Sequence, residues 1–175
     1  MGLYTLEDKG ILSKALADKA SSVLDAARAA NAMIATAESC TGGMIAAALT
    51  AIAGSSAVVE RGFVTYSNRS KEEMLGVPDE LLQQYGAVSE QTVRVMAEGA
   101  LRHSHSQISL AVTGIAGPGG AVLEKPVGTI WLAWAALGRE TCCQLEHFPG
   151  NREQICTQAI MASLQGVLDV LDGWP

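Results

Sequence analysis

A short run of reactive side chains, Glu38-Ser39-Cys40-Thr41-Gly42-Gly43, follows an apolar segment at 32–35 and precedes small residues at 44–53. This order predicts a strand, a tight turn and a helix. Backbone amides at the start of a helix are unpaired and partly positive, so they stabilise anions and developing oxyanions. A nucleophilic Ser39 in such a turn would lie beside its own oxyanion hole. The same residues also suit a helix cap and a bend, and taken alone the segment favours that simpler interpretation.

A serine hydroxyl is almost fully protonated at neutral pH, so Ser39 needs a base before it can attack a carbonyl. The histidines do not suit this role, because His103 and His105 are expected in a solvated loop and His147 at a strand end. Lys71 is the better candidate, since burial or neighbouring cations lower the pKa of a lysine toward neutrality. An exposed helical lysine that pairs with a neighbouring glutamate is the alternative interpretation of Lys71.

Three further features could bind or orient a substrate. Tyr66 could hydrogen-bond the Ser39–Lys71 pair or the substrate, or it could be a half-buried aromatic of a strand. The glycine-rich run at 113–120 could cradle a phosphate with its amides, although it matches neither a Walker A sequence nor a full dinucleotide fingerprint. A flexible surface loop is the alternative there. Arg152 presents a planar fork of donors that suits phosphate, or it is an ordinary solvated arginine near a helix start.

Hydrophobic spacing and turn residues predict the elements that would position these groups. Because strands alternate with helices early in the chain and a hairpin-like pair comes late, we predict an α/β fold, a three-layer α/β/α sandwich with a mixed, mainly parallel sheet. Strands are expected at 32–37, 61–66, 108–112, 128–137 and 141–148. Helices are expected at 11–30, 42–52, 69–75 with Asn68 as cap, 80–85, 90–103 with Ser89 as cap, and 151–171, with a helical turn at 57–60.

Four polar segments lie at the carboxyl ends of predicted strands or in the loops that follow: 38–43, 66–71, 113–120 and 150–152. In open α/β sheets, ligands bind where such loops converge. Together the four segments supply a hydroxyl nucleophile, a lysine, a tyrosine, glycine amides and an arginine. The topology therefore predicts one site at this edge of the sheet.

The composition is that of one globular domain, expected to span residues 1–175 with 1–10 as a loose lead-in. Of the residues, 49% are apolar and 17% charged, which excludes a disordered chain. The net charge of −6 and the lack of a basic cluster argue against a nucleic-acid partner. No segment is apolar enough to span a membrane and the N-terminus lacks a signal core, so we expect a cytoplasmic protein with no membrane partner.

The cysteines form no CxxC pair, and in a reducing compartment they are expected as free thiols. Cys40 could be a reactive thiolate at a helix start. It ranks below Ser39 as a nucleophile, and it is expected to pack inward because adjacent side chains diverge. No cluster of His, Cys, Asp and Glu has the spacing of metal ligands, so we expect no metal.

Several strings of the chain, in this order, resemble the CinA carboxy-terminal family, the nicotinamide-nucleotide (NMN) amidohydrolases. The resemblance covers nearly the whole chain after about residue 11. The matching strings are TAESCTGG at 36–43, GSS at 54–56, RGFVTYSN at 61–68 followed by Lys71, MLGV at 74–77, GAVS at 86–89, VTGIAGP at 112–118 and EKPVGT at 124–129.

The resemblance implies hydrolysis of the carboxamide of NMN to nicotinate mononucleotide and ammonia, a reaction of pyridine-nucleotide salvage. It implies Ser39 as nucleophile, Lys71 as general base, and Tyr66 and Asn68 as residues that position the site. It implies no metal or organic cofactor, a small-molecule mononucleotide substrate, and a homodimer or a larger homo-oligomer. The residues implied to hold the amide, ribose and phosphate are Thr41, Gly42, Gly43, Thr113, Gly114, Ala116, Gly117 and Arg152.

The chain departs from the family pattern in three places. Arg69-Ser70 stands where the family commonly has Glu-Ala, and an added cation there could lower the pKa of Lys71 further or could face solvent. The loop at 121–123 is more apolar than usual, and we expect the protein to lack the extra N-terminal domain of larger members. Two alternative functions stay open: a non-catalytic nucleotide-binding module, and a hydrolase of another small amide or ester.

Overall fold

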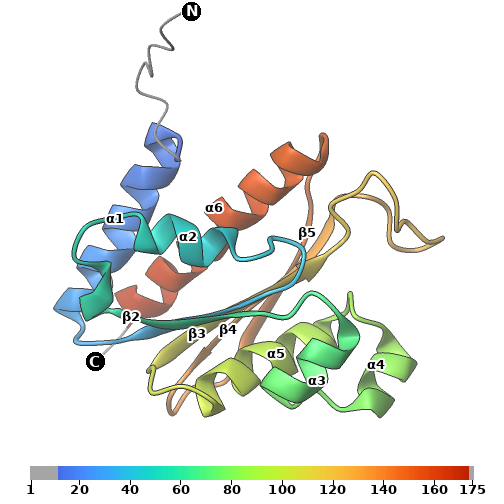
Figure 1. The fold of residues 1–175 in the computed structure, drawn as a ribbon, viewed down its shortest axis with the longest axis horizontal. Helices are drawn as coiled ribbons and strands as arrows, with labels where there is room; N and C mark the ends of the chain where they lie inside the picture. The colour runs from blue at the N-terminus through green and yellow to red at the C-terminus, as the bar shows by residue number, and fades with distance from the viewer. Residues whose placement is uncertain (1–11, 174–175) are drawn as a thin grey trace, which may run out of the picture.

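The computed structural model describes residues 12–173, which fold into six α-helices, one short 3₁₀ helix and five strands (Figure 1). The helices are α1 (Lys14–Ala29), α2 (Met44–Thr50), the 3₁₀ helix η1 (Ser55–Ala57), α3 (Asn68–Leu75), α4 (Asp79–Tyr85), α5 (Glu90–Arg102) and α6 (Arg152–Asp172). The strands are β1 (Ile34–Glu38), β2 (Val59–Val64), β3 (Ile108–Gly114), β4 (Thr129–Ala136) and β5 (Cys142–His147). The expected lead-in at 1–10 lies outside the described residues.

The sheet has the strand order β2-β1-β3-β4-β5. β1 pairs in parallel with both β2 and β3, while β4 pairs antiparallel with both β3 and β5. Of the described strands, β4 therefore opposes the direction of the other four, which confirms the mixed, mainly parallel sheet. Glu38 pairs with Val64 on one side and with Val112 on the other, so three carboxyl ends reach the same edge.

Two layers of helices enclose the sheet and confirm the three-layer sandwich (Figure 1). Helices α1, α2 and α6 cover one face and α3, α4 and α5 the other. Strand β3 shows why both faces are apolar: Leu110 joins the first core and Ala111 the second, because successive side chains of a strand point to opposite faces. A central strand that is buried on both sides reads as a continuous apolar run.

The helix starts follow local chemistry, with one correction. Ser89 caps α5 as expected and accepts a hydrogen bond from the Thr92 amide at 3.2 Å. The cap of α3 is Ser67 rather than Asn68, which is already the first helical residue. Ser67 and Ser70 form a reciprocal capping box, a pairing that a search for Glu or Gln at the third position overlooks.

The helical turn expected at 57–60 is also corrected. The 3₁₀ helix ends at Ala57, and Val59 already belongs to β2. The Ile34 amide donates to the Val58 carbonyl at 2.7 Å, so this segment pairs with β1 and does not continue as a helical turn. Within residues 12–173, no helix combines the length and the apolar character needed to cross a membrane.

Candidate active site

The turn between β1 and α2 places Ser39 at the carboxyl edge of the sheet. The Ser39 amide donates to the Val112 carbonyl at 3.0 Å, so the parallel pairing continues one residue past β1. The chain then turns through Gly42 and Gly43, whose φ angles are +60° and +95°. Glycine adopts this left-handed region at little cost, and two such positions in succession explain the glycine pair.

Lys71 reaches Ser39 from the opposite helical layer. Its Nζ lies 3.1 Å from Ser39 Oγ and donates to the Thr65 carbonyl at 2.9 Å. The side chain is 1% exposed, so the exposed, glutamate-paired alternative is wrong. Burial lowers the pKa of Lys71 because it disfavours the charged ammonium, and a smaller electrostatic effect of Cys40 opposes it. A neutral amine at this distance can accept the hydroxyl proton.

A pocket of about 250 Å³ opens onto this pair. It brings together residues from the β1–α2 turn, the start of α3, the end of β3 and the start of α6. Eight of the residues predicted from the sequence line it: Ser39, Tyr66, Asn68, Lys71, Thr113, Gly114, Ala116 and Arg152.

Four predicted substrate-binding residues do not line the pocket. Thr41 Oγ1 donates to Glu38 at 2.7 Å and the Gly43 amide donates to Glu38 at 3.1 Å. The Gly42 amide donates to the Ser39 carbonyl at 3.1 Å. These groups shape the turn, and the structure does not place them against a substrate. Gly117 lies beside the pocket and meets it through its carbonyl, which accepts a hydrogen bond from Arg152.

The oxyanion hole expected at the start of α2 is not formed by the amides of that helix. The amides of the first turn of α2 are taken by the Glu38 carboxylate, so they do not face a substrate. Within the described β1–α2 turn, the amides of Cys40 and Thr41 donate to no carbonyl of the backbone. Of these two residues Cys40 lines the pocket and follows the nucleophile directly, so its amide suits an oxyanion that develops beside Ser39.

Arg152 links three segments at the mouth of the pocket. Its guanidinium donates to the Gly117 carbonyl at 2.9 Å and to the Tyr66 hydroxyl at 3.1 Å. Arg152 is the first residue of α6, which Asn151 caps in a box with Gln154. An arginine carries five N–H donors, so the guanidinium can hold these partners and still meet an anion. Arg152 is exposed, but these two contacts hold its guanidinium at the pocket.

Residues 16–171 match the family described as the CinA C-terminal domain. This chain belongs to the CinA C-terminal domain family.

Curated relatives and solved structures agree with this membership. The chain is 52% identical over 132 residues to "Nicotinamide-nucleotide amidohydrolase PncC" of Enterobacter agglomerans, covering 75% of this chain and 80% of that protein. It is 50% identical over 140 residues to the PncC protein of Escherichia coli K12, covering 80% and 85%. A "CinA-like protein" of Akkermansia muciniphila is 53% identical over 135 residues, which cover 77% of this chain but 33% of that longer protein. The crystal structure of competence/damage inducible protein CihA from Agrobacterium tumefaciens superimposes with a TM-score of 0.89 at 44% identity, covering 93% of this chain and 99% of that one.

Three residues of this CinA-family pocket were not predicted as site residues: Cys40, Ala87 and Val88. Thr113 Oγ1 holds the Ala87 carbonyl at 2.8 Å, and Lys125 Nζ holds the Val88 carbonyl at 2.7 Å. These contacts use backbone carbonyls, which every residue has, so side-chain types give no signal for them. The string GAVS at 86–89 was the available clue.

The charges of the CinA-family pocket favour an anionic ligand. Among the described residues that line it there is no Asp or Glu, while Lys71 and Arg152 can both carry positive charge. Arg69 does not contribute, because it pairs with Glu73 at 2.6 Å and its side chain is 84% exposed. In this chain, then, the residue that replaces the usual family glutamate faces solvent.

Cys40 is a poor nucleophile here. It is 7% exposed and packs in the core, as expected, and burial raises its pKa to about 12. Cys156 donates to the Cys40 carbonyl at 3.7 Å and lies in the same core. A thiol with such a pKa stays protonated at neutral pH, so Ser39 remains the better candidate.

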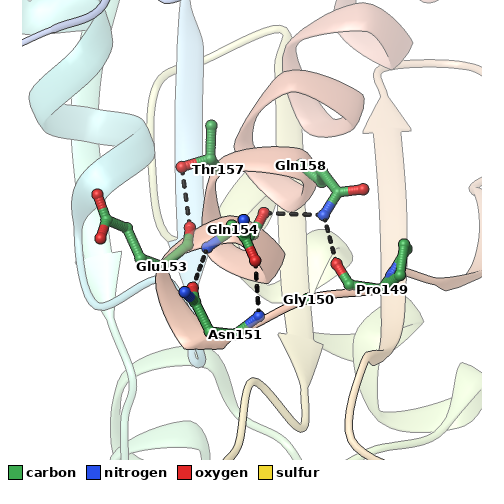
Figure 2. Close-up of a pocket in the computed structure, with 7 residues that line it drawn as sticks. All are labelled: Pro149, Gly150, Asn151, Glu153, Gln154, Thr157 and Gln158. Carbon is green, nitrogen blue, oxygen red and sulfur yellow. Dashed lines mark hydrogen bonds between the residues drawn. The ribbon is translucent and has the colours of Figure 1, made fainter.

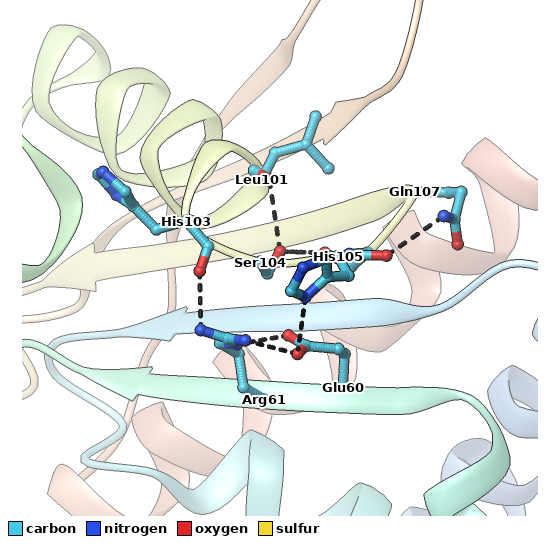
Figure 3. Close-up of polar contacts among 8 residues, drawn as sticks. Glu60, Arg61, Leu101, His103, Ser104, His105 and Gln107 are labelled. Carbon is cyan, nitrogen blue, oxygen red and sulfur yellow. Dashed lines mark hydrogen bonds and ion pairs between the residues drawn. The ribbon is translucent and has the colours of Figure 1, made fainter.

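The other polar features of the described chain lie apart from this pair. A hollow of about 670 Å³ at the start of α6 is lined by residues of which several bond through their side chains to nearby backbone, such as Gln158 to the Pro149 carbonyl (Figure 2). His105 contacts Glu60 at 3.7 Å beside Arg61, in the segment that leads into β3 at the opposite end of the sheet (Figure 3). None of the histidines lines the pocket, and no group of His, Cys, Asp and Glu in residues 12–173 is placed to hold a metal ion.

Proposed function

We propose that this chain hydrolyses the carboxamide of NMN to nicotinate mononucleotide and ammonia, with Ser39 as nucleophile and Lys71 as base. The observation that carries the proposal is the 3.1 Å approach of Ser39 Oγ to the buried Lys71 amine, inside a pocket whose described lining residues include no Asp or Glu. The names of the PncC relatives support the substrate. The site supports the chemistry independently of those names.

Acylation begins when Ser39 Oγ attacks the carboxamide carbon and its proton passes to Lys71 Nζ. The oxyanion that forms on the carboxamide oxygen is stabilised by the amide of Cys40, the residue that follows the nucleophile and lines the pocket. Protonated Lys71 then donates to the departing nitrogen, the C–N bond breaks and ammonia leaves. Ser39 now carries the mononucleotide as an ester, and the Lys71 amine is neutral again.

Deacylation uses the same two residues in reverse. The neutral Lys71 amine takes a proton from water, and the resulting hydroxide attacks the ester carbon. The bond to Ser39 Oγ breaks, Lys71 returns the proton to that oxygen, and nicotinate mononucleotide leaves. One buried amine serves both half-reactions because burial lowers its pKa and so makes the neutral, proton-accepting form easier to reach.

The remaining groups orient the substrate. Arg152 and Tyr66 lie at the pocket mouth, where the guanidinium suits the phosphate. Asn68 lines the pocket at the start of α3 and offers both a donor and an acceptor to the carboxamide. We also propose that the reaction takes place in the cytoplasm, where the four free thiols would stay reduced, and that the protein acts as a homodimer or a larger homo-oligomer.

Substitution of Arg152 tests the phosphate contact. In Arg152→Met we expect KM for NMN to rise about 10- to 100-fold, which corresponds to the loss of one charge-assisted hydrogen bond. The matched substrate is nicotinamide riboside, which has the same carboxamide and ribose but no phosphate. The kcat/KM for nicotinamide riboside should change much less, because with this substrate the substitution removes only the contacts of Arg152 to Gly117 and Tyr66. An equal loss on both substrates would show that Arg152 supports the pocket without binding phosphate.

The pH dependence of kcat tests the base. Only neutral Lys71 accepts a proton, so kcat should rise as the pH passes upward through the lowered pKa of Lys71 and then level off. Steady-state rates between acidic and alkaline pH, with folding checked at each pH by circular dichroism, measure this. A rate that stays constant across that range would remove Lys71 as the base.

Ammonia release from NMN by the purified protein, with no metal added, separates the proposed function from its alternatives. We expect stoichiometric ammonia and nicotinate mononucleotide. Binding of NMN without turnover would favour the nucleotide-binding module. Turnover of simple esters or other amides, but not of NMN, would favour the third function.

A further inference from the structure

Glu38 is a carboxylate without any exposed surface at the last position of β1, next to the nucleophile. A buried carboxylate is costly unless donors surround it. Here five donors do so, two threonine hydroxyls and three backbone amides of the turn and of α2. They are Thr41 Oγ1 at 2.7 Å, Ala46 N at 2.8 Å, Ile45 N at 3.0 Å, Gly43 N at 3.1 Å and Thr36 Oγ1 at 3.2 Å.

These contacts tie together the two ends of the segment that carries Ser39. Glu38 ends the strand, while four of its donors lie at 41–46, across the turn. The carboxylate also faces the positive end of α2, and hydrogen bonds to an ionised acceptor are about twice as strong as neutral ones. The Glu38 side chain thus holds together the two ends of the turn that contains the nucleophile.

Ser39 needs such a restraint, because its partner comes from elsewhere in the fold. Lys71 lies 32 positions later in the chain, in the opposite helical layer. The 3.1 Å distance between Ser39 Oγ and Lys71 Nζ therefore depends on the shape of the turn on one side and on the placement of α3 on the other. A misplacement of about 1 Å at a reacting group can cost about 100-fold in rate.

We propose that Glu38 is a positioning residue for Ser39: its buried carboxylate fixes the β1–α2 turn and thereby keeps the nucleophile within reach of Lys71. This inference rests on the proposed function for the identity of the nucleophile. Glu38 does not line the pocket and takes no part in proton transfer. It acts on the rate of attack by Ser39, and not on the affinity for the substrate.

The test measures Ser39 directly, without NMN. A fluorophosphonate reagent forms a covalent bond to an activated serine oxygen with loss of fluoride, and its second-order rate reports the readiness of Ser39. In Glu38→Gln, which keeps the shape but turns an NH₂ group toward the amide donors, we expect this rate to fall about 10- to 100-fold. We expect kcat for NMN to fall by the same factor and KM to stay within about twofold. Glu38→Asp keeps the charge and should recover part of the rate.

Ser109→Ala is the matched control for stability. It removes another fully buried hydrogen bond, from Ser109 Oγ to the Ala97 carbonyl at 2.6 Å, away from the pocket. At a similar loss in urea-unfolding free energy, its labelling rate should equal that of the wild type. If Glu38→Gln does not fold, Thr41→Val removes a single donor and should show a smaller fall in the same direction.

Equal labelling of wild type and of the Glu38 and Thr41 variants would overturn the positioning role and leave the proposed function standing. A fall in Ser109→Ala as large as that in Glu38→Gln would also overturn it, because stability alone would then explain the rates. A wild-type Ser39 that does not react would overturn both. If the variants label more slowly than the wild type, as expected, but the wild type does not hydrolyse NMN, the proposed function is rejected and the role of Glu38 stands.

Discussion

Ser39→Ala is expected to lower the rate of NMN deamidation by at least about 10,000-fold, because the proposed mechanism forms the acyl intermediate on the Ser39 hydroxyl. Cys40 does not replace the lost hydroxyl, since its pKa of about 12 keeps the thiol protonated. The fold should be retained, because the amide and carbonyl of residue 39 make the turn contacts. Ammonia release and circular dichroism on the same preparation measure both effects.

Ser163→Ala is the control for the removal of a buried hydroxyl. Ser163 Oγ donates to the Ala159 carbonyl at 2.7 Å in the middle of α6, away from the pocket. Its deamidation rate should stay within about twofold of the wild type. Full activity in Ser39→Ala would show that Ser39 is not the nucleophile.

Lys71→Met is expected to lower kcat by about 100- to 10,000-fold, the range that general-base catalysis contributes. The same variant should change how stability depends on pH. In the wild type the unfolded chain binds the lysine proton up to its ordinary pKa of 10.5, whereas the folded chain releases it at a lower pH. Between these two values the unfolded state binds more protons, so the free energy of unfolding rises with pH. Lys71→Met should lack this rise.

Urea unfolding at several pH values, for the wild type and for Lys71→Met, measures the difference. Lys14→Met is the matched control, because the Lys14 side chain is 89% exposed and its removal should leave the pH dependence unchanged. An identical pH dependence in the wild type and in Lys71→Met would show that the Lys71 pKa does not change on folding.

The sequence predicts the architecture well because the fold follows local patterns. The apolar run at 108–112 identifies the central strand, and Ser89 identifies the start of α5 from its cap. Boundaries are less certain, since Val58 and Val59 suit a helical turn as well as a strand until β1 pairs with them. The serine pair that caps α3 differs from the common Ser-x-x-Glu pattern.

The candidate site is predictable where a side chain carries the chemistry. Ser39 and Lys71 follow from residue type and family resemblance, and the structure brings them together. The hydrogen-bond partner of a buried polar group is not predictable in this way. Nothing in the sequence tells whether the amides after Gly42 face a substrate or Glu38, because a helix start serves both. The Arg152–Tyr66 contact joins positions 86 apart and depends on the packing of α6.

The acyl intermediate on Ser39 is the most direct test of the central claim. NMN is mixed with the enzyme, the reaction is quenched with acid after milliseconds, and the peptide that contains Ser39 is analysed by mass spectrometry. The proposed mechanism predicts that Ser39 carries the mononucleotide as an ester and that the ester is absent from Ser39→Ala. Rapid release of ammonia with no adduct on Ser39 at any time, and with the modification on another residue, would contradict it.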